Sequence, residues 1–102
     1  MKILGIEVAV VPDARIAPER GNFGEWRPGR SQIAIDPALV GDQQAETLLH
    51  EVVEAVVSGL GMELEHMKLQ ALARGVYAVL RDNPAEAQAI IRGKRVVTRV
   101  GA

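Results

Sequence analysis

The chain of 102 residues contains no cysteine, which excludes a disulfide framework and thiolate metal sites. It is also poor in aromatic residues, with one Phe, one Trp and one Tyr, although 48% of its residues are hydrophobic. We therefore expect an aliphatic core. Residues 1–102 are expected to form a single domain, because this length is typical of one domain.

An excess of charge of one sign and long apolar runs are also lacking. The 12 Lys and Arg residues nearly balance the 13 Asp and Glu residues, so no overall basic character predicts binding to nucleic acid. No apolar stretch approaches the roughly 18 residues that a membrane helix needs, and Glu7 interrupts the apolar run that a secretory signal would require. We expect a cytoplasmic protein with neither nucleic acid nor a membrane as its partner.

The first third of the chain predicts a small antiparallel sheet, made of one strand and a hairpin. Residues 3–11 alternate as a strand does, whereas residues 13–21 have no apolar period and predict a loop. Residues 22–36 predict a hairpin around a type II turn, because Pro28 suits the second position of such a turn and Gly29 the third.

Apolar residues spaced by three and four then predict two main helices and a short one. The first helix starts near Asp42, a candidate N-cap, and ends at Gly59. The second covers residues 63–81. The third begins with Asn83 as its cap and Pro84 in its first turn, and a glutamate at the right spacing closes a capping box.

Strands gathered before helices favour an α+β fold over a parallel sheet of alternating strands and helices. The expected order is strand, hairpin, helix, helix and short helix. Residues 94–102 are expected to form either a short strand or a flexible tail.

The first predicted helix carries a His-Glu-x-x-Glu motif at residues 50–54. His50 and Glu54 lie one turn apart on one side of the helix, where they can bind one metal ion together. Glu51 is the next residue round, and the corresponding carboxylate of zinc peptidases takes a proton from the attacking water. The carboxylate of Glu54 is a good Zn²⁺ ligand, and its negative charge also suits a harder ion such as Mn²⁺.

A catalytic zinc ion usually has three protein ligands, and His66 is the second of the two histidines in the chain. In an antiparallel helix pair, His66 lies near the end of the first helix and His50 near its start. His66 therefore reaches the site only if the second helix crosses steeply or turns back early. Gln70 is one turn deeper, but a neutral amide is a weak zinc ligand. Tyr77, on the same strip, either donates a hydrogen bond to an oxyanion or packs at the rim.

Four segments resemble small phage and prophage proteins with a minimal metallopeptidase-like domain, and the resemblance spans roughly residues 2–84. The segments are GNFGEW, QIAID, ETLLHEVVEAV and LGMELEHMKLQALARGVYAVLRDNP. This family is similar to the zincin-class peptidases that cleave phage immunity repressors. Resemblance to its His-Glu-x-x-Glu branch implies a zincin-like fold, with Glu51 as the base and His50, Glu54 and His66 as metal ligands.

Two hypotheses from different classes follow. The first is a zinc-dependent peptidase that acts on a peptide or protein substrate, whose strand adds along the hairpin edge near residues 32–35. The second is a catalytically silent zincin-like scaffold that binds a host or phage protein. A phage-encoded protein of either kind would act in the host cytoplasm. The presence of Glu51 beside His50 favours the peptidase. Gln70, at a position where relatives have a glutamate, favours the catalytically silent scaffold.

Overall fold

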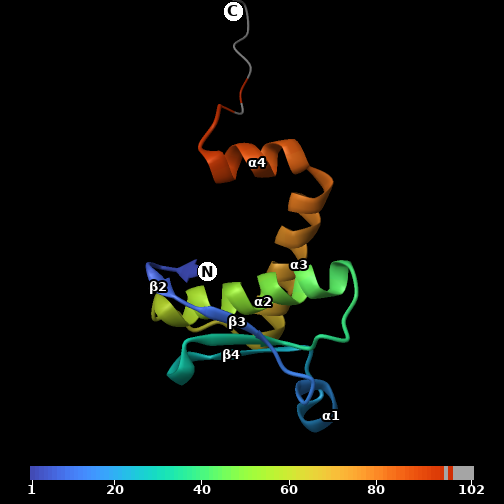
Figure 1. Cartoon of the computed structure of the whole chain (residues 1–102). Coiled ribbons are helices and arrows are strands. Elements are labelled where there is room, and N and C mark those ends of the chain that lie inside the picture. The colour runs from blue at the N-terminus through green and yellow to red at the C-terminus, as the bar shows by residue number, and fades with distance from the viewer. Residues whose placement is uncertain (96, 98–102) are drawn as a thin grey trace, which may run out of the picture.

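The α+β fold is confirmed by the computed structural model, which describes residues 1–95 and residue 97. Two small sheets come first and the helices follow, with helix α2 lying across one face of the larger sheet (Figure 1). The strand or tail expected at residues 94–102 falls largely on residues 96 and 98–102, which lie outside the described residues.

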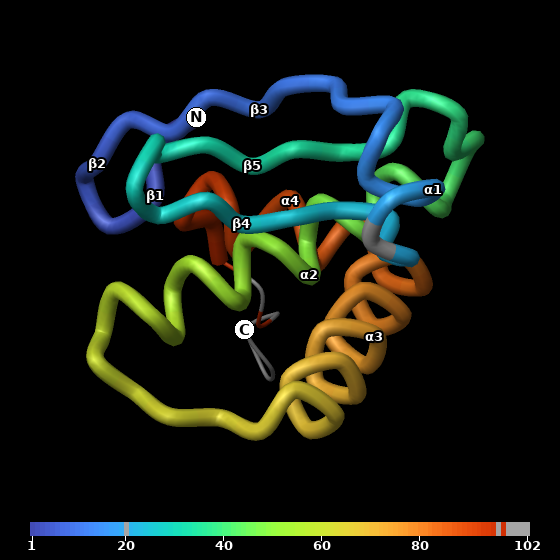
Figure 2. The backbone as a smooth tube through the Cα atoms, turned by 90° about the horizontal axis from the view of Figure 1, so that it is seen from below, coloured from blue at the N-terminus to red at the C-terminus, as the bar shows by residue number. Residues whose placement is uncertain are grey.

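The strands are short and form one two-stranded and one three-stranded sheet. They are β1 (Lys2–Ile3), β2 (Ile6–Glu7), β3 (Ala9–Pro12), β4 (Gly24–Arg27) and β5 (Gln32–Ile35). β1 and β2 pair antiparallel, and the larger sheet has the order β3-β5-β4 (Figure 2). β4 and β5 form the expected antiparallel hairpin, but β3 runs parallel to β5. The larger sheet is therefore mixed, because its central strand β5 is parallel to β3 and antiparallel to β4.

Three local details differ from the sequence expectation. The expected strand over residues 3–11 is interrupted by a turn, in which Leu4 and Gly5 have φ values of 50° and 80°. The expected loop at residues 13–21 contains a short helix, α1 (Ile16–Arg20), which is anchored by the fully buried Ile16. The turn of the hairpin is a 3-10 turn over Pro28–Arg30, and Ser31 rather than a glycine takes the positive φ.

The three predicted helices are all present. They are α2 (Asp42–Gly59), α3 (His66–Asp82) and α4 (Pro84–Arg92). The N-cap of α2 is Gly41 rather than Asp42, and α3 begins three residues later than expected. Asn83 precedes α4 as expected, but the capping box does not form, because the Asn83 side-chain amide donates instead to the Val79 carbonyl oxygen at 2.8 Å.

The core is aliphatic, as expected, and lies between α2 and the sheets. It consists of Ile3, Val8, Ile33, Ile35, Leu39 and Ala55, with Trp26, Leu48, Val52 and Val56 packed against it. Full burial of one such aliphatic side chain contributes roughly 1.5–3 kcal/mol. This core fixes the position of α2 on the sheet, and α2 carries the His-Glu-x-x-Glu motif.

Helices α3 and α4 take a smaller part in the core. Leu69 and Ala73 are the buried residues of α3, whereas all described α4 residues are at least partly exposed. α4 stands away from the sheet, beyond the end of α3 (Figure 1). Within the described part of the chain, every helix is too short or too polar to cross a membrane.

Candidate metal centre

His50 and His66 lie side by side, although 16 positions separate them in the sequence. Their ring centroids are 5.6 Å apart, and the ring planes meet at 68°. The segment 60–65 between α2 and α3 is not helical, and six extended residues can span about 20 Å. His50 lies only about 14 Å along the helix from Gly59, so this segment is long enough to return the chain to the level of His50.

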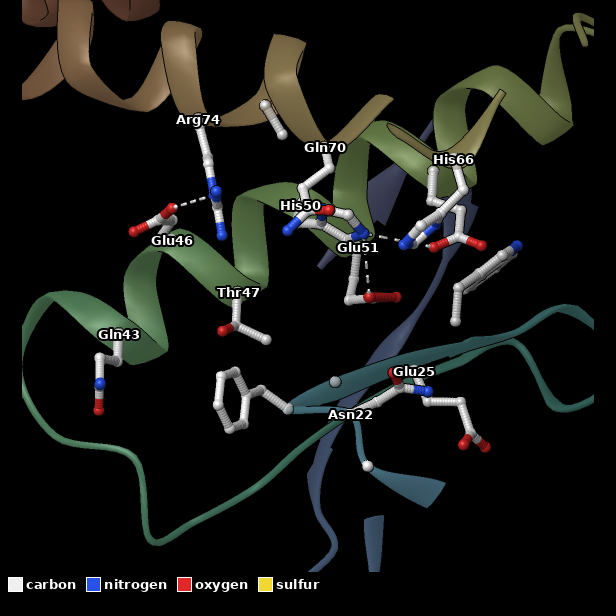
Figure 3. A pocket seen from close by; sticks show the side chains of 16 residues that line it. Asn22, Glu25, Gln43, Glu46, Thr47, His50, Glu51, His66, Gln70 and Arg74 are labelled. Carbon is white, nitrogen blue, oxygen red and sulfur yellow. Dashed lines mark ion pairs between the residues drawn. The ribbon is translucent and has the colours of Figure 1, made fainter. Parts of the chain in front are cut away.

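The donor atoms of the motif gather around one point (Figure 3). His50 Nε2 is 3.7 Å from Glu51 Oε1 and 3.9 Å from Glu54 Oε2. One donor atom from each of these three residues lies within 4.8 Å of the others. Donors around a tetrahedral zinc ion are about 3.3 Å apart, since each bond is about 2.0–2.1 Å long. A small closing movement would therefore let His50 and Glu54 hold one divalent ion.

His66 lies beside this group of donor atoms but is not part of it, since the donors within 4.8 Å of one another come from His50, Glu51 and Glu54 alone among the described residues. Two imidazoles bound to one tetrahedral ion have ring centroids about 5 Å apart, close to the observed separation of the His50 and His66 rings. Burial lowers the pKa of His50, although the Glu54 carboxylate opposes this shift. The neutral imidazole favoured by burial is the form that binds a metal.

Glu51 is the most deeply buried member of the group, with 4% of its surface exposed. Burial, followed by repulsion from Glu54, raises the pKa of Glu51 to about 8, and a hydrogen bond with the Trp26 backbone opposes the shift. Glu51 Oε2 is buried and has no hydrogen-bond partner among the described residues. Burying a carboxyl oxygen without a hydrogen-bond partner costs free energy. A nearby cation or a bound water would supply the partner that Oε2 lacks.

A cavity of about 650 Å³ opens onto these side chains. Its walls come from α2, α3, β4 and the residues before β4. They include Asn22, Phe23, Gly24, Glu25, Trp26, Gln43, Glu46, Thr47, Gln70 and Arg74 as well as His50, Glu51, Glu54 and His66. Arg74 Nε lies 3.4 Å from Glu46 Oε1, so an ion pair between α2 and α3 closes one side of the cavity (Figure 3).

Tyr77 lies apart from this group and is not among the described residues that line the cavity. Its hydroxyl donates to Asp42 Oδ1 at 3.2 Å, at the start of α2. Burial and the Asp42 carboxylate raise the pKa of Tyr77. The structure thus brings His50, Glu51, Glu54 and His66 together and leaves Tyr77 near Asp42.

The cavity borders β4 rather than β5. The substrate edge expected at residues 32–35 is not available, because β5 is the central strand and is paired on both sides. β4 is the edge strand that borders the cavity, and Gly24 and Trp26 were not among the site residues expected from the sequence. A glycine inside a strand often marks a close approach of backbone to another element, which was the available signal for Gly24.

Comparisons with family models, curated proteins and solved structures give no significant match to this chain. The resemblance to phage metallopeptidase-like proteins therefore stays a hypothesis. The function has to be argued from the chemistry of the site.

Proposed function

We propose that this protein is a metal-dependent hydrolase of peptide bonds, with His50, Glu54 and His66 as ligands of a divalent ion. The observation that carries the proposal is the convergence of His50 and Glu54 on the buried carboxyl group of Glu51, whose Oε2 lacks a partner among the described residues, with the His66 ring beside that of His50. When bound, a Zn²⁺ or Mn²⁺ ion would supply Lewis acidity for the attack of water on a carbonyl group. The resemblance of the motif to the zincin class agrees with this chemistry.

In this proposal Glu51 is the general base: its pKa is raised without metal, and the positive charge of a bound ion would lower that pKa so that the carboxylate can accept a proton. It follows His50 directly and has an oxygen 3.7 Å from His50 Nε2, so it would lie beside an ion held by His50, Glu54 and His66. It takes the proton of the attacking water and holds that proton for the leaving amine. Its burial under β4 keeps bulk water away from the carboxyl group.

The outer edge of β4, which pairs with no strand among the described residues, supports an extended peptide as the substrate. The Asp36 N–H donates to the Phe23 carbonyl oxygen at 2.8 Å. Hydrogen-bonded and non-hydrogen-bonded pairs alternate in an antiparallel ladder, so Gly24 and Trp26 direct their backbone groups away from β5, and the Trp26 backbone is hydrogen-bonded with Glu51. A substrate strand that adds to this edge would place a carbonyl group beside Glu51.

A second candidate function, a scaffold that binds another protein, is favoured by one observation. Val79, Ile90 and Ile91 on α3 and α4 are 61%, 69% and 75% exposed. Large apolar side chains with this exposure are available to an interface with another protein. This candidate needs neither metal nor Glu51.

The test is hydrolysis of a mixed peptide library by the Zn²⁺- or Mn²⁺-loaded protein, followed by mass spectrometry, beside Glu51→Gln. We expect Glu51→Gln to keep the metal and to lose about 10²–10⁴-fold in rate, the usual contribution of a general base. Equal rates in the two proteins would overturn the role of Glu51. A protein that binds metal and cleaves no peptide would favour the scaffold.

A further inference from the structure

Strand β4 lies close to helix α2 at Gly24. A Cβ atom added at Gly24 would lie 2.6 Å from Thr47 Cγ2, 3.1 Å from Glu51 Cγ and 3.3 Å from the Ala34 carbonyl oxygen. Real Cβ atoms essentially never approach another heavy atom to within 3.0 Å. β4 could therefore not lie at this distance from α2 if residue 24 had a side chain and Thr47 kept its place.

The two α2 residues at this contact are one helical turn apart, so both face β4. Thr47 lines the cavity, and Glu51 is the proposed base. The proposed metal ligands His50, Glu54 and His66 lie on the helices and not on the sheet. A change in the distance between β4 and α2 therefore moves the substrate edge relative to Glu51 while the ligands stay together.

We propose that Gly24 is a positioning residue of the hydrolytic site. Because it has no Cβ, the edge of β4 lies directly against Thr47 and Glu51, so a substrate strand on β4 is held within reach of the base. This inference rests on the proposed function of the site. It adds that hydrolysis, unlike metal binding, requires β4 to lie close to α2 at residue 24.

The chain offers a matched control on the same hairpin. A Cβ atom added at Gly29 would meet nothing within 4 Å, and Gly29 has no positive φ. Gly29→Ala therefore repeats the chemical change of Gly24→Ala without the close contact. Thr47→Ser removes the Cγ2 atom that the new methyl group would meet and keeps the hydroxyl group.

The experiment compares wild type, Gly24→Ala, Gly29→Ala, Thr47→Ser and the double variant Gly24→Ala/Thr47→Ser. The readouts are kcat, KM, the Zn²⁺ dissociation constant and the emission of Trp26, the single tryptophan of the chain. We expect Gly24→Ala to lower kcat about 10- to 100-fold, since small misplacements of reacting groups have effects of this size. The Zn²⁺ dissociation constant should stay within about threefold, as expected for ligands that do not move. Gly29→Ala should match the wild type.

The Thr47→Ser background makes the test specific. In that background, Gly24→Ala should lower kcat much less than it does in the wild type. We also expect Gly24→Ala alone to shift the Trp26 emission, and the double variant to restore the wild-type emission. Equal losses in both backgrounds, or a parallel loss of Zn²⁺ affinity, would overturn the positioning role. A wild-type protein that hydrolyses no peptide overturns the proposed function itself. A hydrolytic wild type matched by Gly24→Ala overturns only the role of Gly24.

Discussion

The two sides of helix α2 are held in different ways. The side toward the sheets packs apolar residues such as Val52 and Ala55 against strands β1 and β5. The side toward α3 is a polar seam, which we define as the pairs Asp42–Tyr77, Asp42–Arg81, Glu46–Arg74 and His50–His66. Its α2 members recur every four residues, and they therefore follow one side of the helix.

This comparison separates what holds the fold from what forms the site. Apolar burial contributes roughly 25 cal/mol per Å², whereas exposed ion pairs contribute about 0–1 kcal/mol each. The proposed metal ligands lie across the seam, with His50 and Glu54 on α2 and His66 on α3. A bound ion should therefore stabilise the attachment of α3 to α2 more than it stabilises the sheet.

The largest expected effect is in the apolar core. Ile33 is fully buried between the sheet and α2, so Ile33→Ala should lower the free energy of unfolding by about 2–5 kcal/mol through lost burial and a cavity. Ile90→Ala, on the exposed face of α4, is the control and should change it by less than about 0.5 kcal/mol. Denaturant unfolding measures both. Similar costs at the two positions would mean that α4 is covered in solution.

The second-largest effect is the stabilisation that a metal ion bound across the polar seam should give. Zn²⁺ at 100 times its dissociation constant should raise the free energy of unfolding by about 2.7 kcal/mol, because it binds the folded state. His66→Ala should abolish this gain, and a chelator should remove it from the wild type. Thermal unfolding with and without Zn²⁺ measures the difference. An undiminished gain in His66→Ala would show that the ion does not join α3 to α2.

A third effect concerns acid and the sheet. Asp13 accepts hydrogen bonds from Arg27 Nη2 at 2.7 Å and from the Arg15 backbone N–H at 3.0 Å, and these hold the pKa of Asp13 well below its usual range. The stabilisation is therefore fully present above the unfolded-state pKa of about 3.9 and is lost as the pH falls through the lower folded-state pKa.

Asp13→Asn should accordingly be less stable than the wild type at neutral pH, and the two should converge below about pH 4. Asp82→Asn, at an exposed position near the end of α3, is the control. Urea unfolding from pH 7 to pH 2 measures the difference. A constant difference across this range would show that the ion pair with Arg27 does not contribute.

The smallest effect is expected within the seam itself. Arg74 and Glu46 have side chains that are 65% and 41% exposed, so their pairing should contribute at most about 1 kcal/mol and should weaken with salt. A double-mutant cycle with Arg74→Gln and Glu46→Gln, run in metal-free buffer, measures this term. A coupling energy well above that value would mean that the seam holds α3 without metal.

The sequence predicted the helical part of the site because helix periodicity is a local property. The spacing of His50 and Glu54 places them on one side of α2, and the structure agrees. The same rule says nothing of distance along a helix. Tyr77 is 11 residues from His66, about 16 Å along α3, which explains why it shares a strip with His66 but contacts Asp42.

The remaining features depend on contacts between distant segments. The segment 60–65 determines where His66 lies along α2, and this segment has no periodic pattern from which its path could be predicted. The turn at Leu4 and Gly5 interrupts a pattern that alternates well enough for one strand. The parallel pairing of β3 with β5 and the close contact at Gly24 both arise from tertiary packing. Local propensity does not encode the pairing, and the glycine in β4 marks a close approach without naming its partner.

The central claim is that His50, Glu54 and His66 hold one divalent ion beside Glu51. Its most direct test is the metal content of the protein after equilibration with Zn²⁺ and removal of free ion, measured by mass spectrometry. We predict about one equivalent in the wild type and in Glu51→Gln, and a loss of most of it in His50→Ala and His66→Ala, as expected for an ion with three protein ligands. No bound ion in the wild type, or a full equivalent in both histidine variants, would contradict the claim.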